Sequence, residues 1–214
     1  MTKFFAGVIL MGLLLFGSAG TMDYPEGRRL MIVLFVPMFL AGIVMMFRCP
    51  ALLKKRLNAK EKLGEQKLVV GLSALMFIAA FALAGLSFRL GFMRLPGWVS
   101  WVGCAAFLLA YLLYAFVLRE NEYLSRTIEV QENQRVVDTG LYGVVRHPMY
   151  SATILLFFAM ALILRSLMAL IVLLVYPALI VTRLLSEEAF LTENLAGYAE
   201  YKQKVRWRLI PFIW

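Results

Sequence analysis

Two stretches of 21 residues, LVVGLSALMFIAAFALAGLSF at 68–88 and WVSWVGCAAFLLAYLLYAFVL at 98–118, contain no Asp, Glu, Lys, Arg or His. A helix of about 20 apolar residues crosses the roughly 30 Å of hydrocarbon in a bilayer. Lipid offers backbone amides no hydrogen-bond partner, so each stretch is predicted to be a helix whose backbone bonds are satisfied internally. These two predicted spans determine the fold class.

Four shorter apolar blocks lie on either side of this pair. They cover residues 4–19, 30–47, 149–164 and 167–182. The whole chain is 62% hydrophobic and 16% charged, with a mean hydropathy of +0.80, which is outside the range of an ordinary soluble domain. We therefore predict an all-α fold, a polytopic integral membrane helical bundle with about five to six transmembrane helices.

The last two blocks predict a C-terminal helical hairpin. Each has 16 residues, and Arg165 and Ser166 alone separate them. The hairpin either spans the bilayer with the help of flanking residues or stops short of the far face. Pro37 and Pro177 lie inside apolar blocks, where proline is expected to kink a helix.

The basic residues indicate orientation rather than nucleic-acid binding. The formal net charge is +9, but Lys and Arg stand between the apolar blocks instead of on one polar domain. Seven of them fall within 48–67, namely Arg48, Lys54, Lys55, Arg56, Lys60, Lys62 and Lys67. The positive-inside rule makes this segment cytoplasmic, and counting spans from it places the N-terminus, residues 119–147 and the C-terminal tail on the same side. The block at 4–19 is alternatively a cleaved signal peptide, whose loss would move no later loop.

The chain divides near Arg119. Residues 1–118 form a predicted scaffold of four transmembrane helices, whereas 119–214 combine a polar cytoplasmic segment, the hairpin and an amphipathic tail. Cys49 and Cys104 match no metal-binding or redox spacing, so we expect both to pack and predict no metal site.

The polar segment ends where the hairpin begins. VVDTGLYG at 136–143 has two glycines and an Asp, which favour a turn, and a helix is predicted to start at Pro148. This places His147 and Tyr150 at the mouth of the bundle, with free backbone N–H groups nearby to hold a polar ligand. His147 is the single histidine, and taken alone it is either an interfacial residue or a functional one.

Two runs in this half resemble a known enzyme family. TGLYGVVRHPMY at 139–150 contains an RHPxY run at the start of a membrane helix, and RLLSEE at 183–188 follows the hairpin. The second run continues through Gly197, Tyr198, Tyr201, Val205, Arg206, Ile210 and Pro211. In order and in position these runs resemble the isoprenylcysteine carboxyl methyltransferase family, to which phospholipid methyltransferases are related.

The resemblance implies a cytoplasmic site for S-adenosylmethionine. The residues it assigns to the cofactor are Gln134, Arg135, Val136, Val137, Tyr142, His147, Pro148, Met149, Tyr150 and Glu187. It places Arg183 against the methyl acceptor and makes Arg183 and Glu187 the catalytic pair. Gln134 departs from the pattern, because eukaryotic members have a histidine there. A sulfonium cofactor does need acidic, aromatic and hydrogen-bonding groups, and the chain has no GxGxxG loop for a Rossmann site.

Spacing alone permits a simpler interpretation of the catalytic pair. Arg183 and Glu187 are four residues apart and would share one helix face, where an exposed ion pair contributes only about 0.3 to 0.5 kcal/mol.

The predicted function is S-adenosylmethionine-dependent carboxyl O-methylation of a prenylcysteine-like, lipophilic acceptor that arrives from the bilayer. The alternatives within the enzyme class are N-methylation of a phospholipid and S-methylation of a thiol. The alternative from another class is a small transporter or structural membrane protein, which would be expected to carry ionisable residues at mid-membrane. Membrane lipids are the expected surroundings, no nucleic acid is expected as a partner, and the oligomeric state is open.

The charge pattern makes a prediction about topology. Single cysteines introduced at Asn58 and at Asn194, in a background with Cys49 and Cys104 replaced by alanine, should react with a membrane-impermeant maleimide from the same side. Labelling of intact cells against opened membranes measures this. Labelling of the two sites from opposite faces would mean that the span count is wrong.

Overall fold

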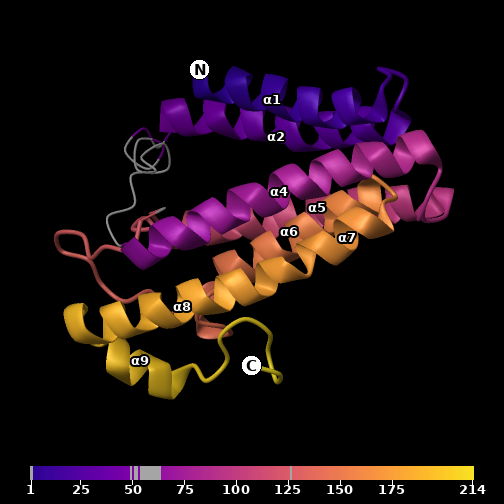
Figure 1. Ribbon diagram of the computed structural model, residues 1–214. Helices are drawn as coiled ribbons and strands as arrows, with labels where there is room; N and C mark the ends of the chain where they lie inside the picture. The colour runs from indigo at the N-terminus through magenta and orange to yellow at the C-terminus, as the bar shows by residue number, and fades with distance from the viewer. Residues whose placement is uncertain (1, 49, 51–52, 54–63, 126) are drawn as a thin grey trace. The chain divides into compact units, whose positions relative to one another are not determined.

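The computed structural model describes residues 2–48, 50, 53, 64–125 and 127–214 of the chain. Within these residues the chain is helical and forms no strand (Figure 1). The elements are α1 (Thr2–Ala19), α2 (Pro25–Arg48), α4 (Gly64–Leu90), α5 (Gly97–Glu120), the 3-10 helix η1 (Gly140–Gly143), α6 (Pro148–Ile163), α7 (Leu167–Leu173), α8 (Val175–Asn194) and α9 (Tyr198–Lys204). The predicted all-α fold is confirmed.

Four helical stretches are long and apolar enough to cross a membrane. They are Pro25–Arg48, Lys67–Leu90, Gly97–Glu120 and Leu167–Asn194, and the shorter apolar helices are Phe4–Ala19 and Pro148–Ile163. The predicted blocks therefore coincide with helices, as a multi-pass membrane protein requires. The hairpin is unequal, because its first arm has 16 residues whereas α7 and α8 together extend over 28. Five residues of the basic segment, Lys54, Lys55, Arg56, Lys60 and Lys62, lie outside the described residues.

Proline has no backbone N–H to donate, and this accounts for the start of α6 and for the break between α7 and α8. α6 begins at Pro148, as expected for a residue that needs no backbone donor in the first turn. The second arm breaks between Leu173 and Val175, and Pro177 lacks the N–H that would bond the carbonyl of Leu173. α2 is assigned as one helix across Pro37.

The described chain forms two compact units, and each draws on separate parts of the sequence. Unit 1 contains Met1–Ala41, Gly71–Leu109 and Leu155–Tyr176, and unit 2 contains Gly42–Val70, Ala110–Ile154 and Pro177–Trp214. The predicted boundary at Arg119 is a functional division, and it stays a prediction.

Unit 1 is held together by close approach of helix backbones. A Cβ atom on Gly85 of α4 would lie 2.6 Å from the carbonyl oxygen of Leu15 in α1, and one on Gly103 of α5 would lie 2.6 Å from the backbone nitrogen of Ile163 in α6. Small residues allow such contacts between membrane helices, where van der Waals packing drives association. Glycine is therefore required at both positions.

Unit 1 also contains a buried charge cluster that links the first turn of α2 to two interhelical connections, α4–α5 and α6–α7. Glu26, 5% exposed, accepts hydrogen bonds of 2.8 Å from Arg94 and 2.8 Å from Arg165. The sequence analysis attributes the basic residues between the apolar blocks to orientation. Arg94 and Arg165 instead hold the ends of helices together.

Candidate functional site

The RHP run lies against the C-terminal tail in unit 2. The backbone N–H of Arg146 donates to the carbonyl of Trp207 at 2.9 Å, and that of His147 donates to the carbonyl of Arg208 at 2.9 Å. The expectation that free backbone N–H groups near His147 hold a polar ligand is wrong for these two groups. A helix start needs partners for its unpaired donors, and here the tail provides them.

Glu188 is the centre of a buried ionic network. Its Oε1 accepts from Arg146 Nε at 2.6 Å and lies 3.1 Å from His147 Nε2, and its Oε2 accepts from Arg208 Nε at 3.1 Å. The side chain is 3% exposed. Because a carboxylate only accepts, we place the His147 ring proton on Nε2. Glu188 thus joins α8 to the start of α6 and to the tail.

Arg146 has further partners that remove the cost of burying its charge. Its Nη1 donates to the carbonyls of Val205 at 2.7 Å and Arg206 at 2.9 Å. A buried ion pair is tolerated when additional hydrogen bonds satisfy the remaining donors. The network therefore bonds both the tail and the RHP run.

The neighbouring Glu187 has a different environment. Tyr150 of α6, 5% exposed, donates its hydroxyl proton to Glu187 Oε2 at 2.6 Å, and its oxygen accepts from Arg183 Nε at 3.1 Å. Arg183 and Glu187 do share a face of α8, as their spacing predicted. They are linked through a third residue, Tyr150, which a surface ion pair would not involve.

The opposite wall is built by the segment that follows α5. Glu120 Oε2 accepts from the backbone N–H of Leu141 at 2.9 Å, and Asn121 Nδ2 donates to the Tyr142 hydroxyl at 3.0 Å. Gly140 has φ +52°, and a Cβ there would overlap Glu120 Oε1, so glycine is required for this contact. Tyr201 of α9 donates to the carbonyl of Tyr142 at 2.7 Å. η1 is thereby held between the end of α5 and the tail.

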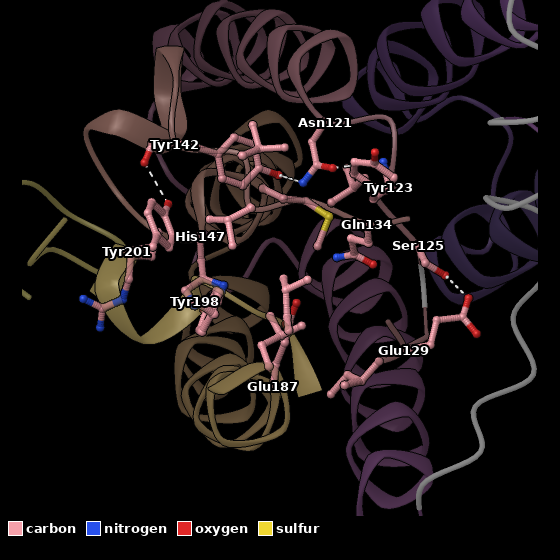
Figure 2. A pocket seen from close by; sticks show the side chains of 18 of the residues that line it. Asn121, Tyr123, Ser125, Glu129, Gln134, Tyr142, His147, Glu187, Tyr198 and Tyr201 are labelled. Carbon is pink, nitrogen blue, oxygen red and sulfur yellow. Dashed lines mark hydrogen bonds between the residues drawn. The ribbon is translucent and has the colours of Figure 1, made fainter. Parts of the chain in front are cut away.

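These walls enclose a cavity (Figure 2). It contains about 850 Å³ of space, counting the open solvent at its mouth. Ten of the predicted site residues line it, namely Gln134, Arg135, Val136, Val137, Tyr142, His147, Met149, Tyr150, Arg183 and Glu187. Pro148, the first residue of α6, is not among the lining residues.

The cavity also has walls that sequence reasoning did not assign to it. Those residues are Asn121, Tyr123, Leu124, Ser125, Thr127, Ile128, Glu129, Arg146, Leu191, Leu195, Tyr198 and Tyr201. A signal for some of them was available, because Leu191 and Leu195 continue the four-residue spacing of Arg183 and Glu187 along one helix face. The lining residues at 121, 123–125 and 127–129 carry no such pattern, and folding alone brings them to the cavity.

Charges at the surface and in the interior have distinct effects on titration. On the exposed surface of unit 2, away from the lining of the cavity, the hydrogen bond and charge of Lys204, 2.6 Å away, lower the pKa of Asp138. In the interior, burial, followed by the charges of Glu188 and Glu187, raises the pKa of Tyr198 well above its usual value. The phenol of Tyr198 is therefore protonated at neutral pH.

The donor set of the cavity fits an organic cation with a flat ring. Glu187 supplies a negative charge, and Tyr142 and Tyr198 supply aromatic rings and hydroxyls. The buried hydroxyl of Tyr198 has no hydrogen-bond partner among the described residues, as expected for a group that a ligand satisfies. Among all the residues that the structure describes, no group of three His, Cys, Asp or Glu side chains is placed to hold a metal ion.

Comparison with known families adds independent evidence. Residues 98–197 match the family model described as phospholipid methyltransferase. This part of the chain is similar to that family. The match begins in α5 and ends just after α8, so it includes the RHP run, Tyr150, Arg183 and Glu187, and it confirms the resemblance to the membrane methyltransferases. No curated protein matches the chain.

The two adjacent glutamates of this family region should differ in their effect on stability. Glu188→Gln leaves Arg146 buried without its counter-ion, and breaking a buried pair in this way costs about 3 to 5 kcal/mol. Glu187→Gln removes a charge from the cavity and should cost about 1 kcal/mol or less, since its partner is a neutral hydroxyl.

Thermal unfolding in detergent compares the two matched variants with the wild-type protein. A clearly lower midpoint for Glu188→Gln than for Glu187→Gln is expected. Equal midpoints would contradict the structural role given to Glu188.

Proposed function

We propose that the chain is an integral membrane methyltransferase that uses S-adenosylmethionine and methylates the carboxylate of a prenylcysteine-like, lipophilic acceptor. The observation that carries this proposal is the placement of Arg183 and Glu187 on either side of the Tyr150 hydroxyl, in one cavity of a methyltransferase-family region. An anionic and a cationic group held so close suit a cationic donor and an anionic acceptor.

The donor would be held by the acidic and aromatic part of the cavity. Glu187 balances positive charge, and the rings of Tyr142 and Tyr150 and the side chain of Met149 contribute the remaining surface. When bound, S-adenosylmethionine supplies an electrophilic methyl group on a positively charged sulfur. Tyr150 keeps the Glu187 carboxylate in place by donating to it, so the negative charge is oriented before any ligand arrives.

The acceptor would be oriented by Arg183. Its guanidinium has five N–H donors in a planar fork, so it can bind a carboxylate while Nε remains bonded to Tyr150. A carboxylate is already ionised at neutral pH, and no general base is required. Positioning two reactants in this way is worth on the order of 7 to 11 kcal/mol of the barrier.

A phospholipid amine is the second candidate acceptor, and the description of the matching family favours it. An ammonium group has to lose a proton before it attacks a methyl group. Glu187 is the lining carboxylate nearest to Tyr150 and would be the group to receive that proton. The same cavity would then use Arg183 for the phosphate of the headgroup.

The proposal includes the orientation of the site. The basic residues between α2 and α4 support a cytoplasmic cavity, which S-adenosylmethionine would enter from the water phase. The acceptor would enter laterally from the bilayer, where its hydrocarbon part is soluble.

A direct assay decides between the acceptors. Detergent-purified protein is incubated with S-adenosylmethionine labelled in the methyl group and, in separate reactions, with a prenylcysteine analogue, phosphatidylethanolamine and a small thiol. We expect label in the prenylcysteine analogue as a base-labile ester. Label in the phospholipid alone would replace the first candidate with the second, and failure of every acceptor together with absence of S-adenosylhomocysteine binding would refute a methyltransferase.

Substitutions at Arg183 and Glu187 should separate the two binding roles. Glu187→Ala should weaken S-adenosylhomocysteine binding, whereas Arg183→Ala should leave that affinity near the wild-type value and lower kcat/KM for the acceptor. The loss of one charge-assisted hydrogen bond is worth roughly 1.5 to 3 kcal/mol, or about ten- to a hundredfold. Arg183→Lys should rescue activity only partly, because lysine lacks the two-pronged contact with a carboxylate.

Calorimetry and steady-state kinetics on folded protein measure these effects. Small and equal effects of both alanine substitutions would instead support the interpretation of the pair as a helix-end contact.

A further inference from the structure

The tail after α9 exposes large apolar side chains although it lies outside the candidate membrane spans. Ile210 is 52% exposed, Phe212 85% and Ile213 72%. They are three of six such residues described outside the candidate spans and the shorter apolar helices, the others being Met22, Phe92 and Val144. Exposed apolar side chains that gather within a few residues mark a surface for contact with a protein or a membrane.

The 208–214 loop, which carries these side chains, is closed by its own backbone. The N–H groups of Arg208 and Leu209 donate to the main-chain oxygen of Trp214 at 2.9 and 3.0 Å, and those of Ile213 and Trp214 donate to the carbonyl of Ile210, both at 3.2 Å. The Arg208 guanidinium also lies over the Trp214 ring, 4.8 Å from its centre. The apolar side chains therefore project from an ordered loop.

The loop is attached to the first turn of α6 and to α8. Ser151 of α6 donates its hydroxyl proton to the carbonyl of Leu209 at 2.6 Å, and Arg208 donates to Glu188 of α8. In Figure 1 the tail turns back under α8 after α9. α6 has 16 residues and is about 24 Å long, which is less than the roughly 30 Å of hydrocarbon in a bilayer. Its first turn therefore lies at the boundary of the hydrocarbon, and so does the loop bonded to it.

The residues around the loop fit a lipid surface. Trp207 precedes the loop and Trp214 closes it, and tryptophan is enriched where a membrane meets water. Residues 198–208 contain four basic side chains, Lys202, Lys204, Arg206 and Arg208, against one acidic side chain, Glu200. Basic residues next to an inserted apolar group attract anionic lipid headgroups.

A second copy of the chain is a poorer partner for the same surface. A symmetric contact through the loop would bring each tail against its own copy. The basic side chains, of which Arg206 is exposed, would then face one another, and like charges across an interface oppose association.

We propose that the 208–214 loop inserts Ile210, Phe212 and Ile213 into the bilayer beside the start of α6, with Arg206 among the lipid phosphates. The tail is then a membrane contact in addition to the helical spans. Because Arg208 bonds Glu188 and α9 lines the cavity, lipid that holds the loop also supports that wall of the cavity. The proposal is independent of the methyl donor and the acceptor.

The test measures the surroundings of a fluorescent label on the full chain in lipid nanodiscs that hold one copy each. In a background with Cys49 and Cys104 replaced by alanine, Ile213→Cys carries an environment-sensitive nitrobenzoxadiazole label. Glu200→Cys is the matched control, because Glu200 is an exposed acidic residue of α9 in the same tail. Two quenchers are compared: iodide in the water phase, and phospholipid with a nitroxide near the headgroup end of its acyl chain.

We expect the label at 213 to emit at shorter wavelength than the label at 200, to lose intensity with the nitroxide lipid, and to be protected from iodide. The label at 200 should show the reverse. Equal iodide quenching at both positions would place the loop in water and overturn the proposal. A label at 213 that is protected from iodide and also from the nitroxide lipid would show that protein covers the loop, which overturns it as well. Thermal unfolding checks that each labelled variant is folded, and Phe212→Cys replaces Ile213→Cys in the same measurement if the latter is not.

Discussion

The arrangement of unit 2 depends on the burial of the Glu188 carboxylate. This group is 3% exposed and is bonded by Arg146 and by Arg208, with His147 in contact, so segments from before α6 and after α9 meet on one side chain of α8. A charge buried to this extent is stable only when its partners are held in good geometry. Because Glu188 has to be paired, the tail packs against the RHP run. This packing also places α9, which contributes Tyr198 and Tyr201 to the wall of the cavity.

Adjacent residues on α8 perform separate tasks because each helical position is rotated by about 100° from the previous one. Glu188 faces the network, and Glu187 faces the cavity, where Tyr150 donates to it. Tyr150 is buried and bonded to both Glu187 and Arg183, so it sets the relative position of the two charged groups. Stability and ligand binding are in this way assigned to neighbouring side chains.

The cavity combines features that a reaction between a polar donor and a lipophilic acceptor needs. Its charged groups come from the end of a helical stretch apolar enough to cross a membrane, Leu167–Asn194. Its polar wall comes from the segment after α5 and from the tail, both outside the candidate spans. In the proposed reaction a water-soluble methyl donor has to meet a lipid-soluble acceptor. A cavity at the end of a candidate membrane span is suited to both.

The sequence alone was sufficient for the helical membrane class, because apolar length and the absence of charge at 68–88 and 98–118 act locally and need no tertiary context. The resemblance based on the runs at 139–150 and 183–188 likewise identified ten residues that line the cavity, six of them within the runs and four at 134–137, since a resemblance reports residue types in order. Tertiary structure decided which of two adjacent glutamates is structural, that Tyr150 links Arg183 to Glu187, and that residues 121, 123–125 and 127–129 form a wall. These facts depend on contacts between segments distant in the chain, and local pattern shows which residues share a helix face but not which segment that face meets or what course a loop takes. The unpaired hydroxyl of Tyr198 belongs to the same group, because whether a buried donor has a partner is a property of the folded cavity.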